Sequence, residues 1–179
     1  MRIIAFASII ILAAVDQLLK AAVVAYLQPV GTITVIPGLL EWKYTENRGA
    51  AFGILADQRW IFMLLTICVV AAAVFFLLFK RCQSKLLIIA LILLISGGVG
   101  NLIDRIVLGY VIDYIFVTFF PFIFNFADCC VCIGAVLFIL YILFFEEKNR
   151  QTMSAEGAEQ LHEGNSHPNH HVGRGGGTD

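Results

Sequence analysis

Residues 60–79 read WIFMLLTICVVAAAVFFLLF, a run that contains no charged side chain. A helix that crosses the hydrocarbon layer of a membrane needs ~20 mostly apolar residues, so this run predicts a transmembrane helix. Three further stretches have a similar character, and they run from about Ile3 to Leu27, Leu86 to Ile103 and Phe126 to Phe145. The sequence therefore predicts a membrane all-α fold built as a four-transmembrane-helix bundle.

The composition of the whole chain agrees with this assignment. Of its 179 residues, 60% are hydrophobic and only 14% are charged. A soluble domain of this length needs a polar shell, which these residues could not supply. The net charge of -1 gives no electrostatic reason to expect nucleic acid as a partner.

The first apolar stretch also has features of a secretory signal, with Arg2 before it and small residues near Ala21 and Ala22. Asp16 and Lys20 lie inside the stretch, however, and the apolar region of a signal peptide carries no charges. We therefore expect a retained first helix.

Lysine and arginine are denser on one predicted side of the membrane than on the other. One side has the N-terminus, a short turn between spans and the C-terminal flank, with Arg2, Lys80, Arg81, Lys85, Lys148 and Arg150. The other side has longer connections that carry Lys43, Arg48, Arg59 and Arg105. Since positive residues concentrate in the cytoplasm, both termini are expected there, with residues 28–59 and 104–125 on the outer face.

The outer connections and the C-terminal tail have their own patterns. Residues 32–36 and 39–44 are rich in β-formers and are separated by Pro37-Gly38, which predicts a small outer-face β element. Residues 115–124 are aromatic-rich and interrupted by Pro121, and they are interpreted as an interfacial or re-entrant segment. We expect a membrane domain at 1–148, with a β-rich segment at about 28–58, and a disordered cytoplasmic tail at 149–179.

Several polar residues fall where a membrane does not readily accept them. A charge at mid-bilayer costs roughly 2.5–3.5 kcal/mol on insertion scales, so such residues are functional candidates. Asp16 and Lys20 are four residues apart and can pair on one helix face. Either this pair locks the first helix to its neighbours, or it contacts a substrate.

Further polar residues cluster at the ends of the third and fourth spans. Asn101, Asp104 and Arg105 project from one side of the third span, and Asn125 and Asp128 begin the fourth. Asp113 stands alone in the apolar sequence between these spans. All of them are expected at the same membrane face.

Two carboxyl groups that meet in a site of low dielectric cannot both ionise cheaply, so one keeps its proton. Such a pair suits peptide hydrolysis, in which one acid takes a proton from water and the other donates to the scissile carbonyl. The chain has no G-x-S-x-G, no H-E-x-x-H and no histidine before residue 162. Spacing does not show that Asp113 meets Asp128, so the residues alone predict an acidic intramembrane site.

Five short motifs in the sequence occur in the same order as in a known protein family. They are Asp16-Gln17-x-x-Lys20, Asn47-Arg48-Gly49-Ala50-Ala51-Phe52-Gly53, Gly97-Gly98-x-Gly100-Asn101-x-x-Asp104-Arg105, Val111-x-Asp113-Tyr114 and Phe124-Asn125-x-Ala127-Asp128. With these elements and four spans, the chain resembles the bacterial lipoprotein signal peptidase (signal peptidase II) family over about residues 1–148. Cys129-Cys130 departs from the family pattern, in which a small residue such as serine is usual, and we expect an effect on packing.

The resemblance implies that Asp113 and Asp128 form the catalytic pair of an aspartyl endopeptidase. Supporting or substrate-binding roles are implied for the remaining polar residues of the motifs, namely Asn101, Arg105, Asn125, Asn47, Asp16, Lys20 and Asp104.

The resemblance also implies the reaction and its setting. The enzyme would remove signal peptides from prolipoproteins just before a diacylglyceryl-modified cysteine, with the β-rich segment cradling the substrate. It would use no metal or organic cofactor, contact membrane lipid and bind globomycin-type inhibitors. It would lie in the bacterial inner membrane with its active site near the periplasmic face.

Two other classes of function use the same buried carboxyl groups. A small proton- or ion-coupled transporter is one, although four short spans without internal repeats do not favour it. A structural or assembly subunit is the other, and in that case conservative changes at both aspartates would be silent.

Overall fold

The computed structural model describes residues 2–49, 59–79 and 84–144. The chain divides into two compact units, Met1–Tyr141 and Ile142–Asp179. Nearly all of the described residues belong to the first unit. The expected tail at 149–179 lies outside the described residues.

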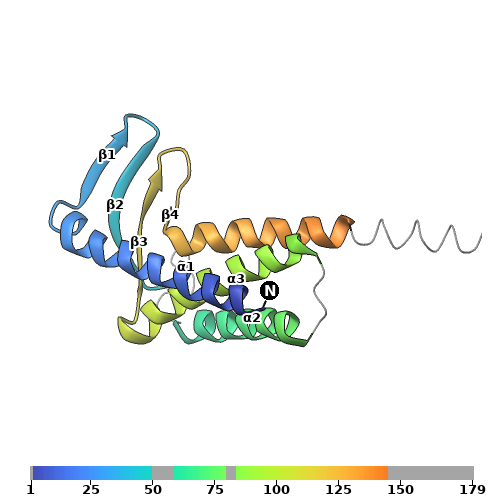
Figure 1. Ribbon diagram of the computed structural model, residues 1–179. Coiled ribbons are helices and arrows are strands. Elements are labelled where there is room, and N and C mark those ends of the chain that lie inside the picture. The colour runs from blue at the N-terminus through green and yellow to red at the C-terminus, as the bar shows by residue number, and fades with distance from the viewer. Residues whose placement is uncertain (1, 50–58, 80–83, 145–179) are drawn as a thin grey trace, which may run out of the picture. The chain divides into compact units, whose positions relative to one another are not determined.

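Four long helices appear in the described parts of the chain, each within a few residues of its prediction (Figure 1). They are α1 (Arg2–Ala22), which continues as the π-helix η1 (Val23–Leu27), α2 (Arg59–Phe79), α3 (Lys85–Val107) and a last helix (Phe126–Phe144). By length and composition, Arg2–Leu27, α3 and the last helix can cross a membrane, whereas the apolar part of α2, Met63–Phe79, is shorter.

Helix α3 packs against both α1 and α2, and about half of its apolar window is buried. Apolar side chains from these three helices form one buried cluster, consisting of Ala5, Ile9, Ala73, Leu77, Leu87, Leu91 and Ile95. Between helices in a membrane, such contacts stabilise by close packing, because lipid is as apolar as the side chains themselves.

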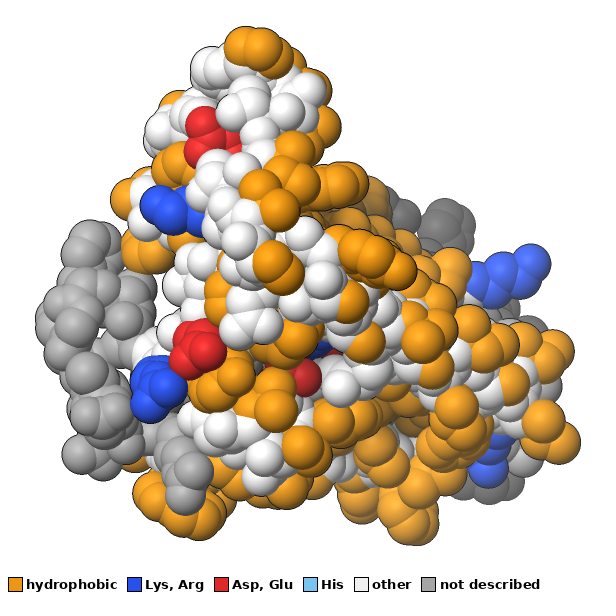
Figure 2. All heavy atoms as spheres, turned by 90° about the vertical axis from the view of Figure 1, so that its left-hand side faces the viewer, with side chains coloured by type: hydrophobic (Ala, Val, Ile, Leu, Met, Phe, Trp, Pro, Cys, Tyr) orange, Lys and Arg blue, Asp and Glu red, His pale blue; other side chains and the backbone are white. Residues whose placement is uncertain are grey.

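Large apolar side chains also cover the outward faces of the helices. Ile3 and Ile10 of α1, Leu64 of α2 and Ile133 of the last helix are all more than half exposed. In Figure 2, hydrophobic side chains cover much of the visible face and charged ones are few. An exposed apolar surface of this extent needs an apolar solvent, which makes the chain a membrane protein.

A four-stranded antiparallel sheet lies at one end of the helices (Figure 1). Its order is β1 (Thr32–Ile36), β2 (Leu40–Asn47), β3 (Val111–Val117) and β4 (Ile123–Phe124). The turn between β1 and β2 contains Gly38 in the left-handed region, with φ of 73°. The prediction of two strands separated by Pro37-Gly38 is therefore confirmed.

Residues 115–124, interpreted from the sequence as an interfacial or re-entrant segment, are part of the sheet. These residues form the second half of β3 and then β4, with Ile115 paired to Phe124. Strand β2 supplies the backbone partners of β3, from Leu40 opposite Val117 to Asn47 opposite Val111. Pro121 lies in the turn between β3 and β4, where the ladder needs no N–H donor.

Glycines on α3 allow close contacts with two neighbouring helices. A Cβ on Gly97 would collide with the backbone carbonyl of Ala127, at the start of the last helix. A Cβ on Gly98 would meet only methyl groups of Val70 and Thr66 on α2. The approach at Gly97 brings the start of the last helix against α3.

We expect Gly97→Ala to lower the free energy of unfolding by about 1–3 kcal/mol, because a backbone carbonyl cannot rotate away from the added methyl group. The matched variant Gly98→Ala should cost less, since side-chain methyls can move. Thermal unfolding in detergent would compare the two variants. Equal losses would contradict the close approach at Gly97.

Candidate active site

Asp113 lies on β3 and is 1% exposed. Its Oδ1 accepts a hydrogen bond from Asn125 Nδ2 at 2.6 Å, and its Oδ2 accepts one from Asn47 Nδ2 at 2.8 Å. Burial and then repulsion from Asp128 raise the pKa of Asp113 to about 7, although both amide hydrogen bonds oppose this shift. The group therefore titrates near neutral pH.

Asp128 lies in the first turn of the last helix, where reciprocal hydrogen bonds fix it. Asn125 Oδ1 accepts from the Asp128 backbone N–H at 2.9 Å, and Asp128 Oδ2 accepts from the Asn125 backbone N–H at 3.1 Å. This is the geometry of a capping box, which satisfies backbone donors at a helix start. The cap of the helix therefore also holds the carboxylate.

Asparagine amides join the two acids. Asn125 donates to Asp113 and also to Asn101 Oδ1 at 3.1 Å. Asn101 in turn donates from Nδ2 to Asp128 Oδ1 at 2.6 Å. Asp113 and Asp128 come from segments 15 positions apart in the chain, yet Asn125 contacts both of them. The structure thus brings together the two aspartates that the sequence could not place.

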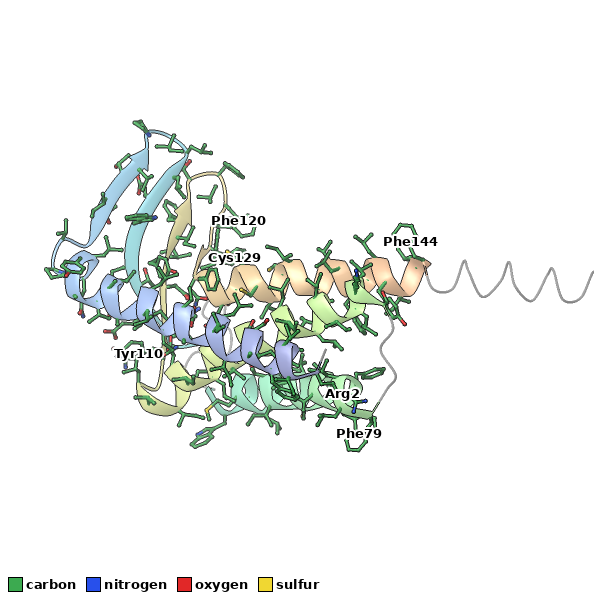
Figure 3. The ribbon with its side chains drawn as sticks, viewed as in Figure 1. Arg2, Phe79, Tyr110, Phe120, Cys129 and Phe144 are labelled. Atoms are coloured by element: carbon green, nitrogen blue, oxygen red, sulfur yellow. The ribbon has the colours of Figure 1, made fainter. Side chains whose placement is uncertain are left out.

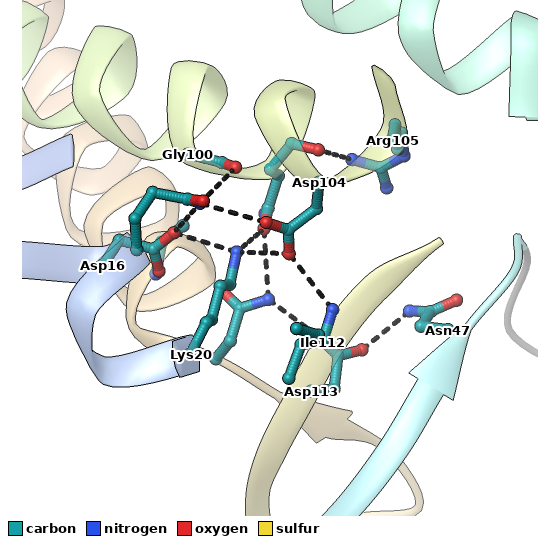
Figure 4. A network of polar contacts seen from close by, with 12 residues as sticks. Asp16, Lys20, Asn47, Gly100, Asp104, Arg105, Ile112 and Asp113 are labelled. Carbon is teal, nitrogen blue, oxygen red and sulfur yellow. Dashed lines mark hydrogen bonds and ion pairs between the residues drawn. The ribbon is translucent and has the colours of Figure 1, made fainter. Parts of the chain in front are cut away.

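A second group of buried charges contacts the Asn101 amide, and Figure 4 shows its members Asp16, Lys20 and Asp104. Lys20 Nζ lies 2.8 Å from Asp16 Oδ2, 2.9 Å from Asp104 Oδ2 and 3.0 Å from Asn101 Oδ1. The side chains of Lys20, Asp16 and Asp104 are at most 2% exposed. The predicted pair of Asp16 and Lys20 is present, with Asp104 as a further partner of Lys20.

Gln17 belongs to the same group, although the sequence analysis gave it no role. Its Nε2 donates to Asp104 Oδ1 at 3.0 Å and to the Gly100 carbonyl at 3.1 Å. The available signal was its place in Asp16-Gln17-x-x-Lys20. A neutral amide in an apolar helix costs less to bury than a charged side chain, so Gln17 is a weaker sign of a functional site than Asp16 and Lys20.

Arg105 lies one residue beyond Asp104 on α3 and is partly buried. Its Nη1 donates to the backbone carbonyl of Asn101 at 3.2 Å. The Arg105 side chain therefore contacts the turn of α3 that carries Asn101, at the same end of the helix as the rest of the site.

A cavity of about 960 Å³ opens beside the two aspartates, and both of them line it. Apolar and aromatic side chains form much of its wall, including Phe119, Phe120 and Phe122. Figure 3 labels two lining residues, Phe120 beside the β3–β4 turn and Cys129 at the start of the last helix. The cavity is large enough for a chain-like ligand with apolar groups.

Charged residues at and just after the end of β2 also line this cavity. Arg48 Nη2 lies 2.9 Å from Glu46 Oε2, and both residues line the cavity. This hydrogen bond is the largest cause that lowers the pKa of Glu46.

Within the parts of the chain that the structure describes, no three His, Cys, Asp or Glu side chains are grouped so as to hold a metal ion. Asp16 and Asp104 do converge, but the ammonium of Lys20 lies between them. The histidines at 162, 167, 170 and 171 are outside the described residues.

The fold and the site together define a helical membrane protein in which two carboxyl groups, each hydrogen-bonded to asparagines, lie beside a largely apolar cavity. Comparison with known proteins identifies the kind of membrane protein. A family profile described as signal peptidase (SPase) II matches residues 8–144. The chain belongs to the signal peptidase II family, and is accordingly a membrane protease.

Individual relatives agree with this assignment. A lipoprotein signal peptidase of Streptococcus thermophilus (strain CNRZ 1066) is 45% identical over 141 residues, which cover 78% of this chain and 92% of the relative. The lipoprotein signal peptidase of Clostridioides difficile (strain 630) is 41% identical over 145 residues, with coverage of 79% and 96%.

Solved structures also resemble this chain. A bacterial membrane enzyme determined by the in meso method at 2.3 Å resolution superposes with a TM-score of 0.69 and 32% identity, covering 78% of this chain and 87% of that one. A second such enzyme, at 1.9 Å resolution, gives a TM-score of 0.70 and 30% identity, with coverage of 78% and 92%.

The hydrogen bond from Asn47 predicts a measurable change in the titration of Asp113. Asn47 donates to the ionised carboxylate, so Asn47→Ala removes an interaction that lowers the pKa of Asp113. We expect the pKa to move upward from about 7. Infrared difference spectra of the carboxyl C=O band would follow the titration, with Asp113→Asn to assign the band. A downward move would contradict the role given to Asn47.

Proposed function

We propose that this protein is an intramembrane aspartyl endopeptidase that removes signal peptides from prolipoproteins, cutting just before the diacylglyceryl-modified cysteine. The observation that carries the proposal is that Asp113 and Asp128 line one cavity and are joined through Asn125. The names of the similar proteins, which are lipoprotein signal peptidases, support the substrate.

The two aspartates divide the chemistry between them. With its raised pKa, Asp113 keeps a proton that it can donate to the carbonyl oxygen of the scissile peptide bond. The Asp128 carboxylate accepts two hydrogen bonds, one from Asn101 Nδ2 and one from the backbone N–H of Asn125, and both favour its ionised form. It takes a proton from water as the water oxygen attacks the carbonyl carbon, which gives a tetrahedral diol. Asp128 then returns that proton to the nitrogen, the C–N bond breaks, and a diol hydroxyl returns its proton to Asp113, which leaves a carboxylic acid and a free amine.

The remaining polar residues of the motifs hold these groups. Asn101 and Asn125 orient Asp128, and Asn47 and Asn125 orient Asp113. Arg105, at the end of α3, supports the turn that presents Asn101. In this proposal the aromatic wall of the cavity receives the lipid-modified cysteine and its neighbours, and a globomycin-type inhibitor competes for the same space.

The proposal includes a placement in the membrane. All four helices span, with the sheet on the outer side and the site near the periplasmic face of the bacterial inner membrane. In Figure 1 the N-terminus, the end of α2 and the start of α3 lie away from the sheet. Arg2 and Lys85 are at that end, which supports a cytoplasmic location by the distribution of positive charge. Residues 1–148 then form the protease domain, and the disordered tail stays a prediction.

Asp113→Asn and Asp128→Asn should each reduce cleavage by a factor on the order of 10²–10⁴, because each variant keeps the shape and removes the acid or base. The assay uses purified protein, a diacylglyceryl-modified precursor and its unmodified twin. Wild-type protein should cleave only the modified precursor, and both variants should keep the thermal stability of a folded protein. Undiminished cleavage by either variant would end the aspartyl assignment.

The rate of cleavage should fall as the pH rises through the pKa of Asp113, about 7. Below this value Asp113 is protonated and can donate, whereas above it both carboxyl groups are ionised and the acid is lost. Initial rates with saturating precursor on the two sides of this pKa would test the sign. A rate that increases across this range would assign the proton to a different group.

A further inference from the structure

Lys20 is a buried cation that the proposed reaction does not use directly. An ammonium has three N–H donors and no acceptor. Three acceptors, on Asp16, Asp104 and Asn101, lie within 3.0 Å of Nζ, so its hydrogen-bonding capacity is matched by these contacts. The side chain is 2% exposed and does not belong to the cavity wall. Contact between Lys20 and a substrate is therefore not supported.

The bond from Lys20 to Asn101 determines which way the Asn101 amide faces. Oδ1 of this amide accepts from Lys20 and from Asn125, and its Nδ2 donates to Asp128. A rotation of the amide by half a turn would place its NH₂ group against two other donors and its oxygen against a carboxylate. Because Lys20 can only donate, it excludes this rotated state.

The two carboxylates that flank Lys20 contact the backbone next to the two aspartates. Asp16 Oδ1 accepts from the N–H of Ala127 at 3.0 Å, and Ala127 directly precedes Asp128. Asp104 Oδ2 accepts from the N–H of Ile112 at 3.1 Å, and Ile112 directly precedes Asp113. One ammonium thus connects the supports of both acids.

We propose that Lys20 is a positioning residue of the peptidase: it holds the Asn101 amide with its N–H toward Asp128, and it ties together the Asp16 and Asp104 carboxylates that support the two catalytic segments. This inference rests on the proposed function. Since Lys20 acts through Asn101 and does not contact the substrate, its loss lowers kcat and leaves KM nearly unchanged.

The first test compares Lys20→Met with Lys85→Met in cleavage of a diacylglyceryl-modified precursor. Methionine keeps most of the length of lysine without its charge, and Lys85 is exposed at the far end of α3. Misplacement of a catalytic group can cost roughly a hundredfold in rate, which is the expected loss of kcat for Lys20→Met. Lys85→Met should stay within about twofold, since it removes an equal charge far from the site.

Loss of one partner from a buried ionic group can also prevent folding. The double variant Lys20→Met/Asp104→Asn removes one positive and one negative charge, so the net charge of the group stays the same. We expect it to fold, as judged by thermal unfolding, and to show the same loss of kcat. Failure of both variants to fold would overturn the positioning role in favour of a purely structural one.

The second test asks whether Lys20 acts through Asn101. In an Asn101→Ala background there is no amide to orient, so Lys20→Met should cost less than about a third of the loss that it causes alone. A role confined to stability would give the same fold-loss in both backgrounds. Equal losses, an unchanged kcat or a loss confined to KM would each overturn the inference.

The outcomes separate this inference from the proposed function. If the Lys20 variants are fully active while Asp113→Asn and Asp128→Asn are inactive, only the positioning role fails. If both aspartate variants cleave normally, the proposed function fails whatever the Lys20 variants do.

Discussion

The pairing of charge inside an apolar bundle is the constraint on which the site depends. Lys20 lies on a helix whose outer face is apolar, and an unpaired ammonium there would be too costly to bury. Asp16 is one turn away on the same helix, but Asp104 and Asn101 come from α3. Pairing the charge therefore requires α1 and α3 to meet at one height, which fixes the register of the two helices.

The same buried group connects helix packing to the sheet and to the last helix. Gly100 on α3 has no side chain, and a Cβ there would lie 2.6 Å from Asp16 Oδ2. Its absence leaves room for Asp16 to reach the N–H of Ala127, while Asp104 reaches the N–H of Ile112. Ionic contacts between α1 and α3 thus extend to the segments that carry Asp113 and Asp128. The packing of α1 on α3, the ion pairs of Lys20 and the positions of Asp113 and Asp128 therefore depend on one another.

The amides of Asn101 and Asn125 lie between the buried charges around Lys20 and the two aspartates beside the cavity. Asn101 accepts from Lys20 and donates to Asp128, whereas Asn125 donates both to Asn101 and to Asp113. Among the described residues, every buried side-chain N or O atom has a hydrogen-bond partner. A polar network in which every member has a partner is rigid, so it holds the carboxyl groups of Asp113 and Asp128 in fixed positions.

The sequence by itself determined the membrane class, the positions of the long helices, the strands β1 and β2, and the polar residues that form the site. The length of an apolar run and turn residues such as Pro37-Gly38 are local features of the sequence, so they predict helices and turns without knowledge of the tertiary structure. Strand β3 was missed because its partner β2 is distant in the chain, and β4 was missed with it because β4 pairs with β3. Only the tertiary structure decided that Asn125 joins Asp113 and Asp128, that Lys20 also pairs with Asp104, and that Gln17 takes part. These contacts join separate segments, and residue spacing carries no information on which segments pack together.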